Sequence, residues 1–282
     1  MTQGVDLEDN VIVARVNSRR RRFDRVGLIL KCFTALILGY LYLPIVVLTV
    51  FSFNDNNVAT LPLRGFTLHW YQDAFANRDL LKSLYNSFYV ATVATLLTLV
   101  LGTATAFAVD RLEFPGKTLF RRLVLLPLVL PGIITGISLL NLFKIMGFNL
   151  SLETVILGHA TALVSVVFIQ VYARLLRWNR GFEEASADLG ANTLQTFFRV
   201  VIPNIRTALV GSGLLCFTLS FDEIPVTFFL TGRDNTLPMY IYSTLRKGIT
   251  PEINAVGTLI IVVSLLLIWT STRMLTDKKS GS

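Results

Sequence analysis

Apolar residues dominate six long stretches of the chain, each close to the roughly 20 residues that a helix needs to cross a bilayer. Polar residues gather in the segments between them, which leaves no room for a separate soluble domain. The pattern predicts an all-α integral membrane protein with six transmembrane helices, at about 28–53, 84–109, 123–147, 154–175, 207–230 and 256–275. These spans would form a single membrane domain over residues 27–276, between terminal tails at 1–26 and 277–282.

Composition agrees with a membrane protein. Hydrophobic residues make up 53% of the 282 residues and charged residues only 16%, too few to cover the surface of an ordinary soluble domain. The net charge of +8 could indicate nucleic-acid binding, but the basic residues lie in short clusters at the edges of apolar stretches. Basic residues placed in this way set the orientation of a protein in a bilayer.

The basic residues favour one orientation. If the N-terminus is cytoplasmic, 18 of the 26 Lys and Arg residues lie on cytoplasmic segments and 7 on outer segments. The cluster of Arg19 to Arg22 with Arg25 precedes an apolar run too long for a cleaved signal peptide. We therefore expect both termini to be cytoplasmic, with the polar residues 1–17 forming a flexible tail.

The loop between the fourth and fifth spans, residues 181–203, carries the most specific pattern of the chain, and we call it the two-helix loop. Its first part reads Glu184-Ala185-Ser186-Ala187-Asp188-Leu189-Gly190. Phe182, Ala185 and Leu189 recur at helical spacing, with the acidic residues turned elsewhere, which predicts a short amphipathic helix. Gly190 would end that helix, because glycine reaches the left-handed conformation without steric cost.

The second part of the two-helix loop has its own start and stop signals. Asn192 and Gln195 stand in capping-box register, and apolar residues follow at helical spacing. Val200-Val201-Ile202-Pro203 comes nine residues after Gly190, and we expect Pro203 to close the second helix before span five.

Two short helices with exposed apolar residues should dock into a groove on a partner, with their charges at the rim. The alternative is a pair of helices lying on the lipid surface. The acidic residues of the first helix argue against this alternative, because helices on membrane surfaces favour Lys and Arg on their polar face.

The residue types and spacing of the two-helix loop resemble the EAA loop of ABC-importer permeases, which reads E-A-A, three residues, G, nine residues, I-x-L-P. Ser186, Val200 and Ile202 depart from this pattern, while its spacing is intact. Residues 220–232, 236–242 and 248–255 look like segments of spermidine/putrescine permease subunits. The likeness covers most of the chain.

The resemblance implies a type I importer with a MetI-like fold in the bacterial inner membrane, which moves putrescine and spermidine into the cytoplasm by alternating access. Its implied partners are a second, related permease subunit, a cytoplasmic pair of ABC ATPase subunits and an external substrate-binding protein. The alternative is an importer of the same class for another solute, such as an opine, an aminophosphonate or ferric iron.

In this family the EAA loop sits in a cleft of the ATPase. By that correspondence the ATPase contact comprises Glu184, Ala185, Asp188 and Gly190, beside the apolar Phe182 and Leu189. The chain has no G-x-x-x-x-G-K-[ST] motif, so the partner would bind ATP, and this chain is expected to be a non-catalytic subunit without a cofactor.

Span five contains two adjacent acids, Asp222 and Glu223. Burying one ionised carboxylate in the bilayer costs at least about 2.5 kcal/mol, so the pair should face a water-filled path. Carboxylates and aromatic rings both attract ammonium groups. The predicted substrate path therefore comprises Asp222, Glu223, Ser220, Trp70, Tyr240 and Tyr242. The alternatives are that span five ends near Phe221, which leaves the acids in the outer headgroup region, and that Trp70 belongs to an interfacial helix.

Span three contains Pro127, Pro131 and Gly132, which predict a kink within the bundle. Some polyamine permeases of this type carry an acid after the second proline of this span, where this chain has Gly132. Fewer carboxylates would suit a smaller or differently charged solute.

An ion channel would not need the two-helix loop. A membrane-embedded enzyme would need a convergent catalytic set, and a metal site would need ligand spacing around His69 or His159; neither pattern is present.

Overall fold

The computed structural model describes residues 5–56, 62–248 and 251–277 of the chain, which are helical apart from loops and one isolated antiparallel bridge between Asn54 and Phe66. The sequence pattern predicts a single membrane domain, whereas the internal contacts divide the chain into two compact units. The first comprises Met1–Ala74 with Ile249–Ser282, and the second comprises Phe75–Gly248. Each unit is described by itself.

The first unit is built on α1 (Val5–Phe51) and α12 (Pro251–Asp277), which pack against each other. Gly257 permits their close approach, because a Cβ atom there would lie 3.1 Å from the Leu48 Cδ1 atom. The next helix in the chain is α2 (His69–Ala76). The flexible tail expected over residues 1–17 stays a prediction; from Val5 onward the structure has the helix α1, and residues 1–4 lie outside the described residues.

The second unit is centred on α3 (Arg78–Arg111) and α6 (Leu152–Leu176), with α9 (Ile202–Phe221) packed against both. Gly102 lets α3 and α6 come close together, because a Cβ atom there would lie 2.6 Å from the Val167 Cβ atom. Buried apolar side chains from these helices and from the turn before α9 form the core: Ala106, Val109, Val166, Val167, Phe168, Val171, Leu175, Val201, Ile205 and Cys216.

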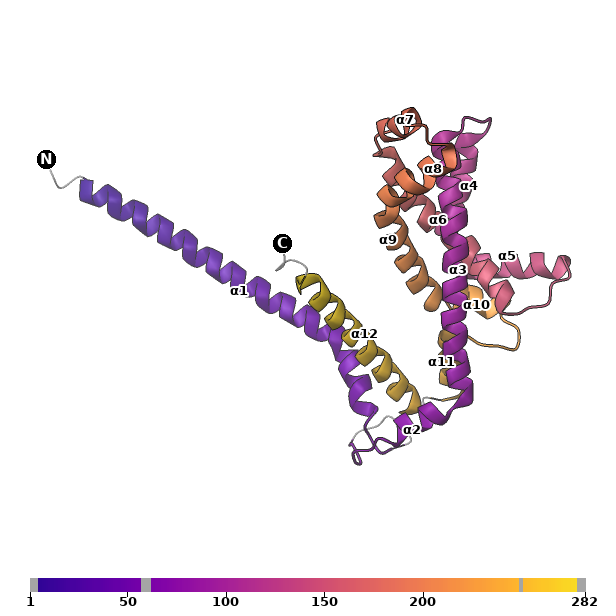
Figure 1. Cartoon of the computed structure of the whole chain (residues 1–282). Helices are drawn as coiled ribbons and strands as arrows, with labels where there is room; N and C mark the ends of the chain where they lie inside the picture. The colour runs from indigo at the N-terminus through magenta and orange to yellow at the C-terminus, as the bar shows by residue number, and fades with distance from the viewer. Residues whose placement is uncertain (1–4, 57–61, 249–250, 278–282) are drawn as a thin grey trace. The chain divides into compact units, whose positions relative to one another are not determined.

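Shorter helices complete the second unit: α4 (Lys117–Val129), α5 (Gly132–Ile145), α7 (Gly181–Asp188), α8 (Thr193–Thr196), the π-helical turn η1 (Phe197–Val201), α10 (Pro225–Leu230) and α11 (Leu237–Lys247). Within this unit, Figure 1 shows α7 and α8 at one end of α3 and α11 nearer its other end. The two-helix loop and α11 therefore lie toward opposite ends of α3.

Four of the described helices contain segments long and apolar enough to cross a membrane: Gly27–Phe51, Arg78–Arg111, Leu152–Leu176 and Thr193–Phe221. The first three confirm helices at the spans predicted at 28–53, 84–109 and 154–175. A bent helix pair brings the number to five, and the described apolar part of α12, Pro251–Leu266, is shorter. The structure therefore supports a multi-pass membrane protein, while six spans and cytoplasmic termini stay predictions.

The predicted single span at 123–147 is wrong as one helix. It is broken into α4 and α5, whose axes differ in direction by 110°. Pro131 explains the break, because a proline ring disfavours helical geometry in the residue before it. Leu130 is accordingly extended, with φ −75° and ψ 134°. Pro127 lies inside α4 without ending it. The helix is therefore interrupted only at the second proline, Pro131.

The predicted span at 207–230 is also not one helix. It ends at Phe221, and the chain begins a new helix, α10, at Pro225, a residue type that suits the first turn of a helix. At the other end, the prediction that Pro203 closes the preceding helix is wrong. Pro203 lies in the first turn of α9, and helical structure runs without interruption from Thr193 to Phe221. The π-helical turn η1 joins α8 to α9.

Candidate functional site

The two-helix loop has the local structure that its sequence predicts. Gly190 has φ 82° and follows the end of α7, where its amide donates to the Ala187 carbonyl at 2.8 Å. Asn192 caps α8: its side-chain oxygen accepts from the Gln195 amide at 2.8 Å, and its own amide donates to the Gln195 side chain at 3.0 Å. These bonds confirm both the glycine corner and the capping box.

One face of the two-helix loop is open and apolar. Phe182 on α7 is 58% exposed, and Leu189, directly after α7, is 89% exposed. Leu194 on α8 and Phe198 on η1 are also exposed. The other residues predicted to contact an ATPase are exposed as well: Glu184, Ala185, Asp188 and Gly190. Large exposed apolar side chains rimmed by charge are typical of a protein-docking surface.

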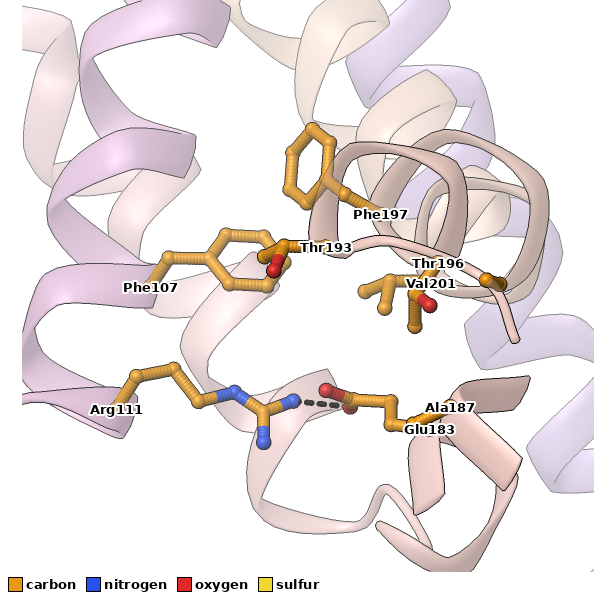
Figure 2. Close-up of a pocket in the computed structure, with 9 residues that line it drawn as sticks. Phe107, Arg111, Glu183, Ala187, Thr193, Thr196, Phe197 and Val201 are labelled. Atoms are coloured by element: carbon orange, nitrogen blue, oxygen red, sulfur yellow. Dashed lines mark hydrogen bonds and ion pairs between the residues drawn. The ribbon is translucent and has the colours of Figure 1, made fainter. Parts of the chain in front are cut away.

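The opposite face of the loop covers a cavity of about 370 Å³ beside the end of α3, lined by Phe107, Arg111, Glu183, Ala187, Ala191, Thr193, Thr196, Phe197 and Val201. Figure 2 shows the Arg111 side chain reaching from α3 toward Glu183 on α7, where the two form an ion pair. Trp178 Nε1 also donates to Glu183 Oε1, at 2.8 Å. Glu183 is thus turned inward, and no local sequence signal identifies Arg111 as its partner.

The two acids lie where the fifth predicted span is broken. Asp222 is exposed at the end of α9, and its amide donates to the Thr218 carbonyl at 3.2 Å. Glu223 is half-buried, and its Oε1 atom accepts from the Val226 amide at 3.0 Å, which satisfies one free amide at the start of α10. The helix does end at Phe221, while the position of the acids relative to the bilayer stays a prediction.

Both helix breaks of this unit meet at Glu223. A Cβ atom on Gly132, at the start of α5, would lie 3.5 Å from Glu223 Oε1 and 3.1 Å from the Pro225 Cβ atom. Farther along α5, a Cβ atom on Gly136 would lie 3.2 Å from the Pro225 carbonyl oxygen. The small residues of α5 therefore allow α10 to pack closely and place the carboxylate of Glu223 against the break between α4 and α5.

Ser220 and Thr227 flank the acids and are joined by a buried histidine. His159 on α6 lies with Nδ1 2.7 Å from Ser220 Oγ and Nε2 2.8 Å from Thr227 Oγ1. Thr227 donates its own hydrogen to the Glu223 carbonyl at 2.9 Å, so it accepts from His159 Nε2. The His159 imidazole thus ties α9 and α10 to α6 across the break, and the Ser220 hydroxyl points toward His159.

We expect replacement of His159 by Ala to destabilise the protein by about 1–3 kcal/mol, because it leaves two buried hydroxyls without this partner. Thermal unfolding of the purified protein would measure the effect. His69→Ala is the matched control, because the side chain of His69 is 41% exposed and its loss leaves the acids untouched. An unchanged melting temperature for His159→Ala would contradict a tie across the break.

The three aromatic residues predicted for the substrate path each make contacts of their own. Tyr240 accepts from Asn77 Nδ2 at 2.9 Å and lines a polar cavity of about 460 Å³ with charged residues such as Asp79 and Asp234. The Tyr242 ring lies 5.2 Å from the Arg246 guanidinium carbon. Trp70 belongs to the other unit, where its Nε1 donates to the Asn54 carbonyl at 2.9 Å. The part of these three rings in a substrate path therefore stays a prediction.

Among the described residues, no group of three or more His, Cys, Asp or Glu side chains is placed to hold a metal ion.

Comparison with known proteins identifies relatives over most of the chain. Residues 99–277 match the family described as binding-protein-dependent transport system inner membrane component. The spermidine/putrescine transport system permease protein PotC of Haemophilus influenzae is 33% identical over 251 residues, covering 89% of this chain and 97% of the relative. The putrescine transport system permease protein PotI of Escherichia coli K12 is 35% identical over 236 residues, covering 80% and 84%.

Solved structures share the fold. A bacterial alginate ABC transporter, in complex with its alginate pentasaccharide-bound periplasmic protein, matches with a TM-score of 0.70 at 15% identity, covering 92% of this chain and 96% of the other. The MetNI methionine ABC transporter in an inward-facing conformation matches with a TM-score of 0.54 at 17% identity, covering 71% and 94%. The all-helical fold predicted from the sequence is therefore one that ABC transporters also have.

Proposed function

Because the chain belongs to the family of binding-protein-dependent transport system inner membrane components, we propose that it is the permease subunit of a type I ABC importer for polyamines. It moves putrescine and spermidine into the cytoplasm across the bacterial inner membrane. It does so by alternating access, without a cofactor or catalysis of its own, and ATP is bound and hydrolysed by a partner subunit.

The polyamine assignment is supported first by the relatives, since PotC and PotI are named for spermidine and putrescine transport and match nearly their whole length. The structural observation that carries it is the position of Glu223. A polyamine has two or more ammonium groups, for which carboxylates are the natural complement. Where some polyamine permeases have an acid, this chain has Gly132, and the Glu223 carboxylate from the facing helix break lies beside that position.

The proposed partners are a pair of cytoplasmic ABC ATPase subunits, a second, related permease subunit and an external binding protein. The open apolar face of the two-helix loop supports the first of these, because it offers Phe182 and Leu189 as anchor side chains for a groove. The alginate transporter was solved with its periplasmic protein bound, which supports a binding protein for a chain of the same fold.

The continuity of α8, η1 and α9 suggests how ATP would drive transport. Helical structure runs from Thr193 in the two-helix loop to Phe221, directly before the acids. When the ATPase subunits close on ATP, they push the two-helix loops together, and α9 carries that movement toward Asp222 and Glu223. The outer side opens, and product release reverses the change.

Uptake of labelled putrescine and spermidine tests the proposal. Cells carrying the complete importer should accumulate both polyamines, and cells in which only this chain is deleted should not. Excess unlabelled opine, aminophosphonate or ferric iron should leave the uptake unchanged. If the intact importer takes up none of the polyamine but does take up one of these solutes, the importer class stands and the substrate is wrong.

A further inference from the structure

We propose that an ion cluster of Asp110, Arg111, Arg180 and Glu183 is a mechanical clamp that makes α3 move with the first helix of the two-helix loop. This inference rests on the proposed importer function and adds to it a second route for the movement, besides the continuous path into α9. The residues belong to three separate segments: the end of α3, the turn after α6 and the first turn of α7.

Glu183 fastens α7 to its surroundings through two donors. Arg111 on α3 forms an ion pair with Glu183 Oε1, and Trp178 donates to the same oxygen at 2.8 Å. The Arg111 side chain is 23% exposed and that of Glu183 25% exposed, so water screens the pair less than it would on an open surface. Figure 2 shows this pair at one side of the cavity, with Phe107 and Phe197 above it.

Asp110 completes the cluster from the α3 side. Its side chain is only 7% exposed, and its Oδ2 atom lies 3.2 Å from Arg111 Nε and 3.4 Å from an Arg180 NH2 nitrogen. The same Arg180 nitrogen also donates to the Asp110 backbone carbonyl at 3.3 Å. Two acids and two arginines therefore balance in charge, and Arg111 bonds both acids at once, which suits the forked guanidinium group.

The clamp matters because little else joins α7 to α3. The residues of α7 pack mainly against α8 and η1, while the cavity of about 370 Å³ separates the loop from α3. Among the described residues, the polar contacts between α7 and α3 run through Glu183 and Arg111. A Ser186–Thr196 hydrogen bond of 3.0 Å joins α7 to α8, and the Phe107–Phe197 ring contact joins η1 to α3.

A push on the two-helix loop can therefore reach the core by two routes. The second helix is continuous with α9, and the first helix acts on α3 through the clamp. Since α3 packs against both α6 and α9, moving α3 and α9 together preserves their packing, whereas moving α9 alone would shear it. Without the clamp, we expect ATP hydrolysis to continue while less of it is converted into transport.

The test uses the complete importer in proteoliposomes, with polyamine transport and ATP hydrolysis measured on the same preparation. Glu183→Gln and Arg111→Gln should each lower the polyamine transported per ATP by about tenfold while hydrolysis itself persists. The double variant should be no worse than Arg111→Gln alone, because Arg111→Gln already removes the Arg111–Glu183 pair. Arg111→Lys keeps the positive charge but lacks the forked guanidinium group. Its polyamine transport per ATP should therefore fall between that of Arg111→Gln and that of the intact protein.

Glu113→Gln is the matched control. Glu113 lies two residues from Arg111, its side chain is 89% exposed, and it pairs with Lys117 four residues away. Its loss should leave transport per ATP unchanged. A Glu183→Gln variant that transports normally would overturn the clamp, and so would equal losses of transport and hydrolysis, which would indicate a role in ATPase docking.

Amide hydrogen exchange separates failure of the clamp from failure of the proposed function. Glu183→Gln should speed exchange in residues 181–188 of the purified complex, whatever its substrate. Faster exchange in an importer that transports no polyamine would support the clamp and overturn the substrate. Unchanged exchange together with normal transport per ATP would overturn the clamp and leave the substrate standing.

Discussion

Converting Asp222 to Asn and Glu223 to Gln together is expected to lower uptake of putrescine and spermidine at least about tenfold, since hydrogen bonds to charged groups contribute about 1.5–3 kcal/mol each. The change removes the two negative charges at the helix break, while the new side chains keep nearly the shape of the old ones. Glu223 Oε1 accepts from the Val226 amide at 3.0 Å, and a glutamine oxygen can accept the same bond. The start of α10 should therefore stay capped, so that lost uptake reports on charge.

Uptake of labelled polyamine at matched membrane abundance would measure this effect. Glu113→Gln serves as the control, because it removes one exposed acid far along the chain from the break. An importer of an anionic solute should not lose activity in the double variant, whereas an importer of a cation should. Normal polyamine uptake by Asp222→Asn with Glu223→Gln would place the cation site elsewhere.

The single variants divide the effect between the two acids. Glu223 is half-buried against Gly132 and Pro225, whereas Asp222 is exposed at the end of α9. A charge is screened less when it is partly buried, so Glu223→Gln should account for more of the loss than Asp222→Asn.

The parts of the fold that the sequence predicts well depend on local signals. Gly190, Asn192 and Gln195 lie within six residues, and their backbone preferences and side-chain bonds decide the corner of the two-helix loop without help from distant segments. Long apolar runs likewise predict the helices of α3 and α6, because hydrophobicity and length are properties of the run itself.

The prolines show why helix breaks are harder to predict. Pro127 lies inside α4, Pro203 lies in the first turn of α9, and Pro131 and Pro225 stand at breaks. The residue type is the same in each case, but the outcome depends on whether neighbouring segments can stabilise the ends of two shorter helices. At the two breaks that support comes from packing between α5 and α10, and from Glu223, which accepts from an amide at the start of α10.

Contacts between distant residues could not be predicted from one sequence. Arg111 and Glu183 are 72 positions apart, and His159 lies 61 and 68 positions from its two partners. Nothing in the spacing of these residues selects their partners, because the packing of α3, α6 and α9 decides which side chains meet. The sequence alone predicts that the acids of the first loop helix lie at the rim of a docking surface, whereas the structure turns one of them, Glu183, toward α3.

Replacing Gly190 by Val is expected to abolish uptake while the protein still inserts into the membrane. Gly190 has φ 82°, a conformation that costs a residue with a side chain about 1–2 kcal/mol, and more for a β-branched one. A Cβ atom there would meet nothing within 4 Å, so the added bulk would project from the loop next to Leu189, into the surface proposed to contact the ATPase. Both effects disturb the docking face and leave the apolar helices untouched.

Gly116→Val provides a control matched in backbone geometry. Gly116 has φ 83°, has equally open surroundings and precedes α4, outside the two-helix loop. Both variants should lose similar stability in thermal unfolding of the complex, but only Gly190→Val should lose uptake and the ATP hydrolysis that accompanies it. Gly190→Asn should retain more uptake than Gly190→Val, because asparagine tolerates the left-handed conformation. If Gly190→Val transported as well as Gly116→Val, the corner of the loop would have no role beyond local folding, and the proposed ATPase contact would have to lie elsewhere on this chain.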